Sequence, residues 1–429
     1  MSAASKLRVL IAAHSHPEVS NGGAEIAAFA LFRGLQRQPD CETWFLGCDR
    51  MAAAERPGAV LSQPFSDREF LYCTGAFEWF RFANPDPRFP AEITRLFGEL
   101  APDVVHFHHY INFGLEVFLH LRRARPDCRI VLTLHEYLAV CHHFGQMVTK
   151  PHRTLCHQSG PARCQQCFPE YSRGDFFLRR SYIGRFFALV DMFVAPSRFL
   201  ADRYIAWGVP AEKMAVLENL LPPHPLPPTP LPADGPLRVG FFGQISALKG
   251  IDVLFDAAAL LATDAAAAVS FDIFGDYRGQ PPEVQAGFLT RLDTGGGNVR
   301  FHGPYDRMQV DRLMQSVDAV LVPSVWWENS PVVIQEAIRN RRPVICSDIG
   351  GMAEKVRDGI DGLHFRAGSP TALAALLRRL AGDRGPLLAL AAAMTGRAAL
   401  TVGVDDFMAL YRRPLVASPL EVDDGARRD

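Results

Sequence analysis

Short apolar runs alternate with amphipathic segments along most of this chain. In the first half, the runs LRVLIAA, VVHFHH, RIVLTLHE and MFVAPS predict buried strands. Helical patterns follow two of these runs, one from about residue 24 to residue 36 and one from near Arg198. Because strands that alternate with helices form parallel sheets covered on both faces, the pattern predicts an α/β architecture.

A break near the middle divides this pattern into two units. Residues 222–236, PPHPLPPTPLPADGP, are rich in proline and lack periodicity, which predicts a semi-rigid linker. The alternation restarts with LRVGFFG, VSFDIFG, NVRFHG, AVLVPS and RPVICSD. We therefore predict two doubly wound, Rossmann-like domains, residues 1–221 and 237–400, then a C-terminal helix and a frayed tail over residues 401–429. Such folds bind ligands at the carboxyl ends of their strands, so the site is expected in the cleft between the domains.

Composition and charge narrow the class of protein. The 429 residues are too many for a single core, and 48% hydrophobic with 21% charged residues is typical of a soluble globular protein. The formal net charge of −1 provides no field for a polyanion, so nucleic acid is not expected as a partner. The apolar run near the N-terminus is too short for a membrane span and no signal-cleavage pattern follows, which favours a cytoplasmic location.

The stretch PSVWWENSPVVIQEAIRNRRPVICSDIGG carries the strongest chemical signal. A strand ends at its start, and the loop VWWEN leads to Ser330 and Pro331, which suit the N-cap and the first position of a helix that runs to about Asn340. The amides around Val332 and Val333 have no partners within such a helix. Together with the helix dipole, they predict an anion site suited to a diphosphate.

Two glutamates flank this predicted anion site. Glu328 lies in the loop before the helix and can accept hydrogen bonds from ligand hydroxyls. Glu336 lies about a turn and a half into the helix, where a carboxylate can bind both hydroxyls of a ribose. A pair of glutamates at this spacing is by itself more often a pair of solvated surface charges. The capped helix, the strand end and the following SDIGG favour a nucleotide-sugar site instead.

These motifs, in this order, resemble the retaining GT-B glycosyltransferases of family 4. The second half contributes VGFFGQISALKGIDVL, FDIFGD, VRFHGPY and the glutamate stretch, and the first half contributes HSHPEVSNGGAEIAAFAL, PDVVHFHH and TLHEY. The resemblance spans nearly the whole chain and implies two domains that face a cleft, with the donor bound mainly by the second. It also implies transfer of a sugar from a nucleotide-diphosphate sugar to a glycan or lipid-linked acceptor, in cell-surface polysaccharide assembly.

The resemblance assigns roles to residues of the second domain. Glu328 and the backbone from Asn329 to Val333 would bind the donor sugar and phosphates, and Glu336 would bind the ribose. Lys249, in SALKG, would contact the diphosphate as a point charge. The family usually has arginine where this chain has Gln244, so one positive charge is missing from the expected leaving-group clamp.

Residues of the first domain are expected to complete the site. Gly22 and Gly23 would let the backbone approach the phosphates, although a glycine pair is equally typical of a simple turn. His135 would face the donor sugar, and the pair His135-Glu136 stands where the family has His-Asp. His106, His108 and His109 invite a metal interpretation, but only His106 and His108 share a strand face, and no donor-metal motif is nearby, so no metal is expected there.

The catalytic residues that we predict are His135, Lys249 and Glu328. No pair of carboxylates is placed as nucleophile and acid, so we expect front-face attack in which the leaving diphosphate accepts the proton of the acceptor. The protein would position the substrates and stabilise the leaving group, and no cofactor is expected to be required. The alternatives are a nucleotide-sugar epimerase with the same fold and a non-catalytic glycan- or nucleotide-binding protein.

A cysteine-rich loop over residues 141–167 is the second chemical signal. Cys141, Cys156, Cys164 and Cys167 have the spacing C-x14-C-x7-C-x2-C, which can supply four thiolates to a tetrahedral structural zinc. A redox pair and plain unpaired thiols are the alternatives. The loop falls beside the cleft on the side where the family binds acceptors, so it is a candidate for shaping the acceptor site.

Two clusters of arginines are candidates for contact with a membrane surface. Arg122, Arg123 and Arg125 form one cluster, and Arg179, Arg180 and Arg185 form the other. Either cluster is suited to peripheral contact with an anionic inner membrane, although arginines in such clusters more often form a solvated face.

Overall fold

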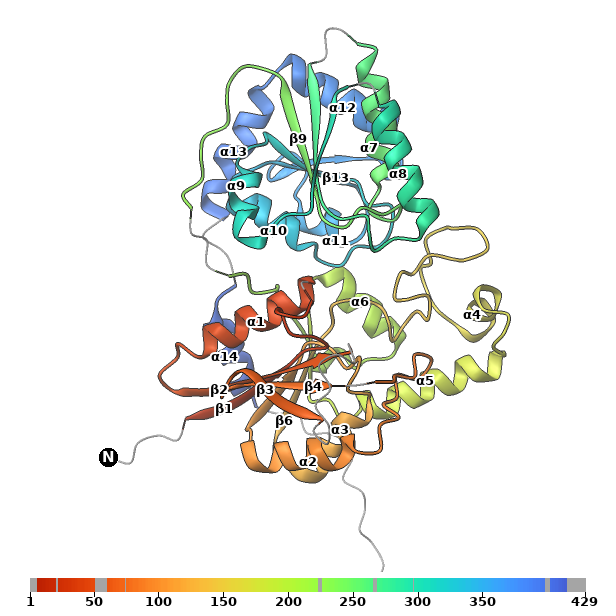
Figure 1. Ribbon diagram of the computed structural model, residues 1–429, viewed down its shortest axis with the longest axis vertical. Coiled ribbons are helices and arrows are strands. Elements are labelled where there is room, and N and C mark those ends of the chain that lie inside the picture. The colour runs from red at the N-terminus through yellow and green to blue at the C-terminus, as the bar shows by residue number, and fades with distance from the viewer. Residues whose placement is uncertain are drawn as a thin grey trace, which may run out of the picture.

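The computed structural model describes residues 6–20, 22–50, 60–73, 75–222, 226–264, 268–295, 297–397 and 402–414. Within these residues, the chain forms two α/β units, each built on its own sheet (Figure 1). The predicted fold class, two doubly wound domains, is confirmed. The predicted tail beyond residue 414 lies outside the described residues.

The first sheet has eight strands in the order β3-β4-β2-β1-β5-β6-β7-β8. The strands are β1 (Leu7–Ala12), β2 (Cys41–Asp49), β3 (Leu61–Ser66), β4 (Glu69–Cys73), β5 (Val104–Phe107), β6 (Arg129–Thr133), β7 (Met192–Ala195) and β8 (Met214–Val216). The helices are α1 (Gly23–Leu35), α2 (Phe89–Leu100), α3 (Glu116–Ala124), α4 (Pro161–Cys167), α5 (Arg173–Phe187) and α6 (Arg198–Trp207), and a 3-10 turn spans Ala211–Lys213.

All pairings in this sheet are parallel except the one between β3 and β4. The four predicted runs form β1, β5, β6 and β7 at the centre of the sheet, where strands buried on both faces read as continuous apolar segments. The sequence did not predict β2, β3, β4 and β8. Those strands are shorter or carry polar residues, as β3 does at the exposed edge with its central proline.

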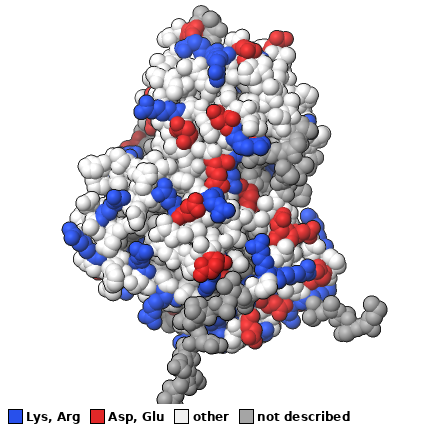
Figure 2. All heavy atoms as spheres, turned by 180° about the vertical axis from the view of Figure 1, so that it is seen from behind, with Lys and Arg blue, Asp and Glu red and all other residues white. Residues whose placement is uncertain are grey.

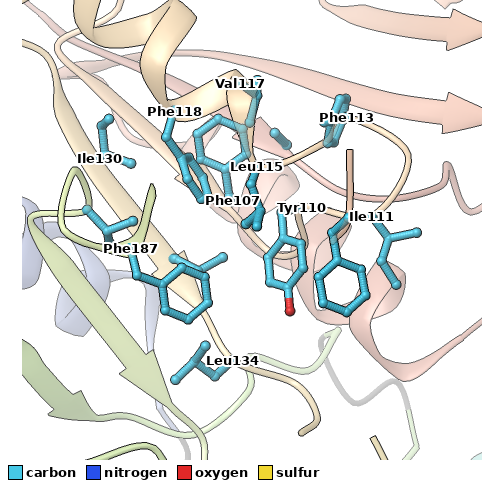
Figure 3. Packing of buried hydrophobic residues seen from close by; sticks show 14 of the residues in the cluster. Phe107, Tyr110, Ile111, Phe113, Leu115, Val117, Phe118, Ile130, Leu134 and Phe187 are labelled. Atoms are coloured by element: carbon cyan, nitrogen blue, oxygen red, sulfur yellow. The ribbon is translucent and has the colours of Figure 1, made fainter. Parts of the chain in front are cut away.

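Aromatic side chains fill the space between this sheet and the helices on one face. Phe107 of β5 packs edge-on against Phe118 of α3, with 5.1 Å between ring centroids, and Phe187 of α5 contacts Tyr110 at 5.9 Å. Figure 3 shows these rings together with the aliphatic side chains of the same buried cluster. The packed layer fixes the carboxyl end of β5, which is followed by His109, one of the residues that line the cleft.

The second sheet has six strands in the order β11-β10-β9-β12-β13-β14. The strands are β9 (Leu237–Phe242), β10 (Val269–Phe274), β11 (Val299–Gly303), β12 (Ala319–Val322), β13 (Val344–Ser347) and β14 (Gly362–Phe365). The helices are α7 (Ile251–Ala262), α8 (Pro282–Thr294), α9 (Val310–Met314), α10 (Val332–Arg339), α11 (Gly350–Lys355), α12 (Pro370–Gly382) and α13 (Gly385–Arg397), and a 3-10 turn spans Arg307–Gln309. The five predicted runs form β9 to β13.

The proline-rich segment connects the two sheets without a helix or strand in its described residues, 222 and 226–236. It is held on the second domain, since the buried guanidinium of Arg342 donates to the carbonyl and hydroxyl of Thr229, both at 2.9 Å. The segment is therefore attached to the second domain at Thr229.

The last described helix, α14 (Val404–Arg412), returns to the first domain and packs beside α1 (Figure 1). Phe407, Leu410 and Tyr411 are buried in the same cluster as Val9 and Ile11 of β1. Because α14 follows the second domain in sequence, the chain crosses between the domains twice. Periodicity alone does not reveal this return, because it requires knowing which surface the helix covers.

Candidate functional site

A cleft of about 1300 Å³ opens between the two domains at the carboxyl ends of their strands. Its walls include every residue to which we assigned donor binding or catalysis: Gly22, Gly23, His135, Gln244, Lys249, Glu328, Asn329, Ser330, Pro331, Val332, Val333 and Glu336. These residues come from loops that are far apart in sequence. The fold therefore brings them together in one cavity large enough for a nucleotide sugar.

The amino ends of two helices meet across this cleft. In α10 the first backbone hydrogen bond runs from the N–H of Ile334 to the carbonyl of Pro331, at 3.0 Å, so the amides of Val332 and Val333 are left for another partner. The start of α1 lies opposite, since a Cβ atom added to Gly23 would lie 3.4 Å from Cγ2 of Val332. Two helix dipoles thus point their positive ends at the same space, which favours an anion.

The expected cap of α10 is wrong. The N-cap residue is Pro331, with no side-chain cap, and the Ser330 hydroxyl instead donates to Glu218 Oε1 of the first domain at 2.7 Å. A serine hydroxyl can cap a helix or bond a neighbour, and here the nearby carboxylate across the interface takes it. Ser330 therefore contributes to the contact between the domains.

Glu328 and Lys249 form an ion pair in the cleft. Oε1 of Glu328 accepts hydrogen bonds from Lys249 Nζ at 2.6 Å, from the Ser324 hydroxyl at 2.8 Å and from the indole N–H of Trp326 at 2.8 Å. The sequence suggested separate ligand contacts for the two residues and did not suggest this pairing. Since three donors converge on one oxygen, the carboxylate has a fixed orientation and its other oxygen remains available to a ligand.

Residues 323–331, which lead from β12 into α10 and are called the donor loop below, pack closely against α11. This packing explains the SDIGG motif. The N–H of Gly351 donates to the carbonyl of Glu328 at 2.8 Å, and a Cβ atom at Gly351 would lie 1.5 Å from the carbonyl oxygen of Asn329. No side chain fits there, so α11 can support the donor loop only because position 351 is glycine.

Glu336 is buried in α10, and an arginine that the sequence did not single out lies near it. Burial raises the pKa of Glu336, while the positive charges of Arg307 and Arg339 oppose this shift. Arg307 Nη2 lies 3.8 Å from Glu336 Oε1 and lines the cleft. Arg307 follows the VRFHGPY motif by two positions and adds a positive charge to the wall that contains Gln244.

Histidines and acids form the opposite wall. Nδ1 of His109 accepts the N–H groups of Tyr110 and Ile111, at 3.0 and 3.1 Å, so its proton sits on Nε2, which lies 3.3 Å from Glu136 Oε1. Desolvation raises the pKa of Glu136 to about 8, although the Leu138 N–H and neighbouring positive charges oppose it. Glu136 is therefore mainly protonated at neutral pH.

A second histidine–acid pair lies at the start of α1. His14 Nε2 is 3.2 Å from Glu25 Oε1. Burial alone would raise the pKa of Glu25, but the hydrogen bond and charge of His14 outweigh it and lower that pKa. The sequence did not identify this pair. The only signal for it was an acid two residues after the glycine pair, in the first turn of the predicted helix.

His135 is linked directly to the donor loop. The side-chain amide of Asn329 donates to the main-chain carbonyl of His135 at 3.2 Å, and Asn329 Oδ1 accepts the hydroxyl of Ser197 at 2.6 Å. Desolvation lowers the pKa of His135 to about 3, so its ring is neutral. The side chain of Asn329 thus joins the domains, while its backbone faces the cleft.

Comparison with protein families decides to which family the chain belongs. Residues 21–224 match the family described as Glycosyltransferase Family 4, and residues 236–383 match the family described as Glycosyl transferases group 1. The chain belongs to glycosyltransferase family 4. The first match includes His135 and every strand of the first sheet except β1, and the second includes Lys249, Glu328 and Glu336 and all strands of the second sheet.

Curated relatives of this chain include D-inositol 3-phosphate glycosyltransferases. The one from Nocardia farcinica is 35% identical over 159 residues, which are 36% of this chain and 35% of the relative. The one from Xylanimonas cellulosilytica is 30% identical over 224 residues, 48% of this chain and 52% of the relative. The chain thus spans about a third to a half of the length of these relatives.

Solved structures agree on the fold. A structure of Anabaena Alr3699/HepE in complex with UDP-glucose has a TM-score of 0.62 and 17% identity, covering 94% of this chain and 98% of the other. Sucrose-phosphate synthase from Thermosynechococcus elongatus has a TM-score of 0.66 and 16% identity over the same shares. The predicted GT-B fold is therefore confirmed.

The cysteine-rich loop contacts the donor loop. The indole N–H of Trp327 donates to the carbonyl of Cys156 at 3.1 Å, and the His157 ring packs against Trp327 with 5.2 Å between centroids. The four predicted ligands, Cys141, Cys156, Cys164 and Cys167, are half-buried free thiols, and burial raises the pKa of Cys141 to about 11. Across the described ranges, no three His, Cys, Asp or Glu side chains are arranged to hold a metal ion, so the zinc stays a prediction.

The arginine clusters are only partly at the surface. Arg179 is buried, and its guanidinium donates to the carbonyls of Phe80, Leu138 and Ala139. Including Arg179 in a membrane-facing cluster was therefore wrong, because a guanidinium with several donors can satisfy main-chain carbonyls inside a loop-rich core. In the part of the chain that the structure describes, no helix has the length and apolarity needed to cross a bilayer.

The burial of Glu136 predicts a pH-dependent stability. Because the folded-state pKa of about 8 lies above the ordinary 4.5, the stability due to the neutral acid is full below about pH 4.5 and is lost as the pH rises through 8. Glutamine does not ionise, so the free energy of unfolding of Glu136→Gln does not fall in this way. Relative to the wild type, the variant gains about 1–3 kcal/mol of stability between pH 5 and pH 9, a value already reduced for the partial exposure of the side chain. Urea unfolding at several pH values measures the difference. Glu170→Gln, at an exposed site, is the control, and parallel curves for Glu136→Gln and wild type would refute the shift.

The zinc prediction has a direct test. Purified protein is expected to contain about one zinc per chain, and the double variant Cys164→Ser/Cys167→Ser is expected to lose it. Elemental analysis by mass spectrometry measures the content, with Lys150→Ala, at an exposed position of the same loop, as the control. Folded and active protein without metal would end the zinc assignment.

Proposed function

We infer that the protein is a retaining glycosyltransferase that moves a sugar from a nucleoside diphosphate sugar to a glycan or lipid-linked acceptor. The observation that carries this proposal is the convergence in one cleft of the free amides of α10, the Lys249 ammonium and two buried carboxylates, Glu328 and Glu336. The curated relatives are named D-inositol 3-phosphate glycosyltransferases, and this name supports the same class of reaction.

Each part of the donor has a matching part of the cleft. The diphosphate is proposed to lie on the Val332 and Val333 amides, between the starts of α10 and α1, with Lys249 nearby. Glu336 then reaches the ribose hydroxyls from within α10. The sugar is proposed to extend toward Glu328 and His135, which line the same cleft.

The proposed chemistry needs no nucleophile from the protein. The bond between the anomeric carbon and the diphosphate oxygen breaks, and the acceptor oxygen bonds to the same face of that carbon. The acceptor's proton passes to the leaving diphosphate. Lys249 and the α10 amides stabilise the charge that develops on this leaving group. Glu136 is unsuited as a nucleophile, because its raised pKa of about 8 keeps it largely neutral.

The setting proposed for this reaction is cell-surface polysaccharide assembly in the cytoplasm, with peripheral contact at the inner membrane. Exposed basic residues that remain available for such contact include Arg123, Arg180 and Arg185. Figure 2 shows basic and acidic side chains intermixed over much of one face, in keeping with the net charge of −1 and with a partner other than nucleic acid.

A ligand screen tests the donor class. UDP-, GDP- and dTDP-sugars are each added to the protein, and the melting temperature is measured, because a ligand that binds the folded state raises it. We expect one nucleotide class to raise the melting temperature by several degrees at about 100 times its Kd, in line with a stabilisation of about 2.7 kcal/mol. Turnover is then assayed with and without glycan and lipid-linked acceptors. Donor conversion that needs no acceptor would indicate an epimerase, and absence of any nucleotide effect would refute the donor site.

Two substitutions separate binding from catalysis. Glu336→Ala is expected to raise the KM for the donor about 10- to 100-fold, since it removes a charged hydrogen-bond acceptor from the ribose. Lys249→Ala is expected to lower kcat about 100-fold or more, since it removes charge stabilisation of the leaving group. Steady-state kinetics measures both, with Glu283→Ala and Lys6→Ala at exposed positions as matched controls. Near-wild-type kinetics in both variants would remove the donor-site assignment.

A further inference from the structure

Two histidines at the end of β5 lie behind the cleft wall and take no part in the proposed donor contacts. His106 is fully buried, with Nδ1 2.7 Å from the Tyr411 hydroxyl of α14 and Nε2 2.7 Å from the Thr133 hydroxyl of β6. His108 is 2% exposed and packs on the His106 ring, with 4.5 Å between centroids. Both nitrogens of His106 are thus bonded, and its ring supports that of His108 from behind.

His108 is bonded to the histidine of the cleft wall. Its Nδ1 lies 3.0 Å from Nε2 of His135. The two rings are inclined by only 25°, and their centroids are 5.2 Å apart, as expected for nearly coplanar imidazoles joined edge to edge. Burial lowers the pKa of both histidines, so both rings are neutral and one shared proton must form this bond.

The surroundings of His108 decide which ring carries that proton. Nε2 of His108 is buried without a hydrogen-bond partner among the described residues. If His135 donated, His108 would hold its own proton on Nε2, as a buried N–H with no acceptor. If His108 donates from Nδ1, its Nε2 is a bare lone pair, and an unpaired buried acceptor is tolerated more often than an unpaired buried N–H.

The second arrangement defines the state of His135. Its Nε2 accepts from His108, so its own proton lies on Nδ1. Within the described residues, Nδ1 of His135 has no protein partner, and the residue lines the cleft. We propose that His108 is a positioning residue that holds His135 in its Nδ1–H form, so that the cleft contains a neutral N–H donor for a ligand oxygen.

The tautomer of His135 does not depend on the proposed function. Only the effect of His108 on the kinetics rests on that function. A fixed tautomer presents a donor to a sugar hydroxyl or phosphate oxygen at every turnover, whereas an unsupported ring would divide its population between two tautomers. The loss of His108 therefore weakens binding and turnover through His135, although His108 itself touches no substrate.

The tautomer can be observed directly. In protein labelled with ¹⁵N-histidine, long-range proton–nitrogen spectra distinguish a nitrogen that carries hydrogen from one that is bare, and His135→Gln identifies the signals of His135. We expect Nδ1 of His135 to carry the proton and Nε2 to be bare. A protonated Nε2 with a bare Nδ1 in the wild type would overturn the proposal, whatever the variants do.

Two variants of His108 test the consequence. His108→Asn keeps an N–H donor near the position of Nδ1, and His108→Leu has similar bulk but no donor. We expect kcat/KM to fall about 10- to 100-fold in His108→Leu and to stay within about threefold of wild type in His108→Asn. His120→Leu, on α3 and away from the cleft, is the matched control. Equal losses in both His108 variants would refute the positioning role.

The tautomer spectrum separates this proposal from the proposed function. The expected spectrum in a protein that transfers no sugar to any acceptor would support the His108 assignment and count against the glycosyltransferase activity. The opposite spectrum in an active enzyme would reject the role of His108 alone.

Discussion

The structure depends on keeping the first amides of α10 unpaired and facing the cleft. A helix start buried without partners is costly, so the surrounding fold must supply space for an anion rather than a capping side chain. Pro331 at the N-cap has no side-chain donor or acceptor, and Ser330, which has one, is bonded to Glu218 of the other domain. Gly23 and Gly351 leave room on either side, because a larger residue at 351 would collide with the donor loop.

The donor loop also bridges the two domains, beside α11, where Glu354 accepts the amides of Arg198 and Phe199. Asn329 bonds the carbonyl of His135, Ser330 bonds Glu218, and Trp327 bonds the carbonyl of Cys156. Three separate segments of the first domain thus contact one short loop of the second. A movement of the domains relative to each other would therefore separate this loop from His135, so closure of the cleft and assembly of the site are coupled.

Buried ionisable groups set the electrical character of the first-domain wall. Burial lowers the pKa of His106, His108 and His135 and raises the pKa of Glu136, so all four groups are mainly neutral. The positive groups of the cleft lie on the second domain, where Lys249 and Arg307 each face a glutamate. A diphosphate would thus meet positive charge on the second domain, and on the first domain it would meet neutral histidines and Glu136 beside the His14–Glu25 pair. The positive side suits a leaving group whose charge increases during the reaction.

The sequence by itself determined the two α/β domains, the linker and the membership of the cleft wall, because strand–helix alternation, a proline-rich break and the glutamate stretch are all local patterns. It did not reveal the return of α14 to the first domain, the Glu328–Lys249 ion pair, Arg307 beside Glu336, or the histidine pairing behind His135. Each of these joins residues from separate loops, and which neighbour a side chain bonds is a matter of distance in three dimensions. For the same reason Ser330 was expected to cap α10 and Arg179 to reach solvent, whereas a carboxylate across the interface and main-chain carbonyls in the core bind them instead.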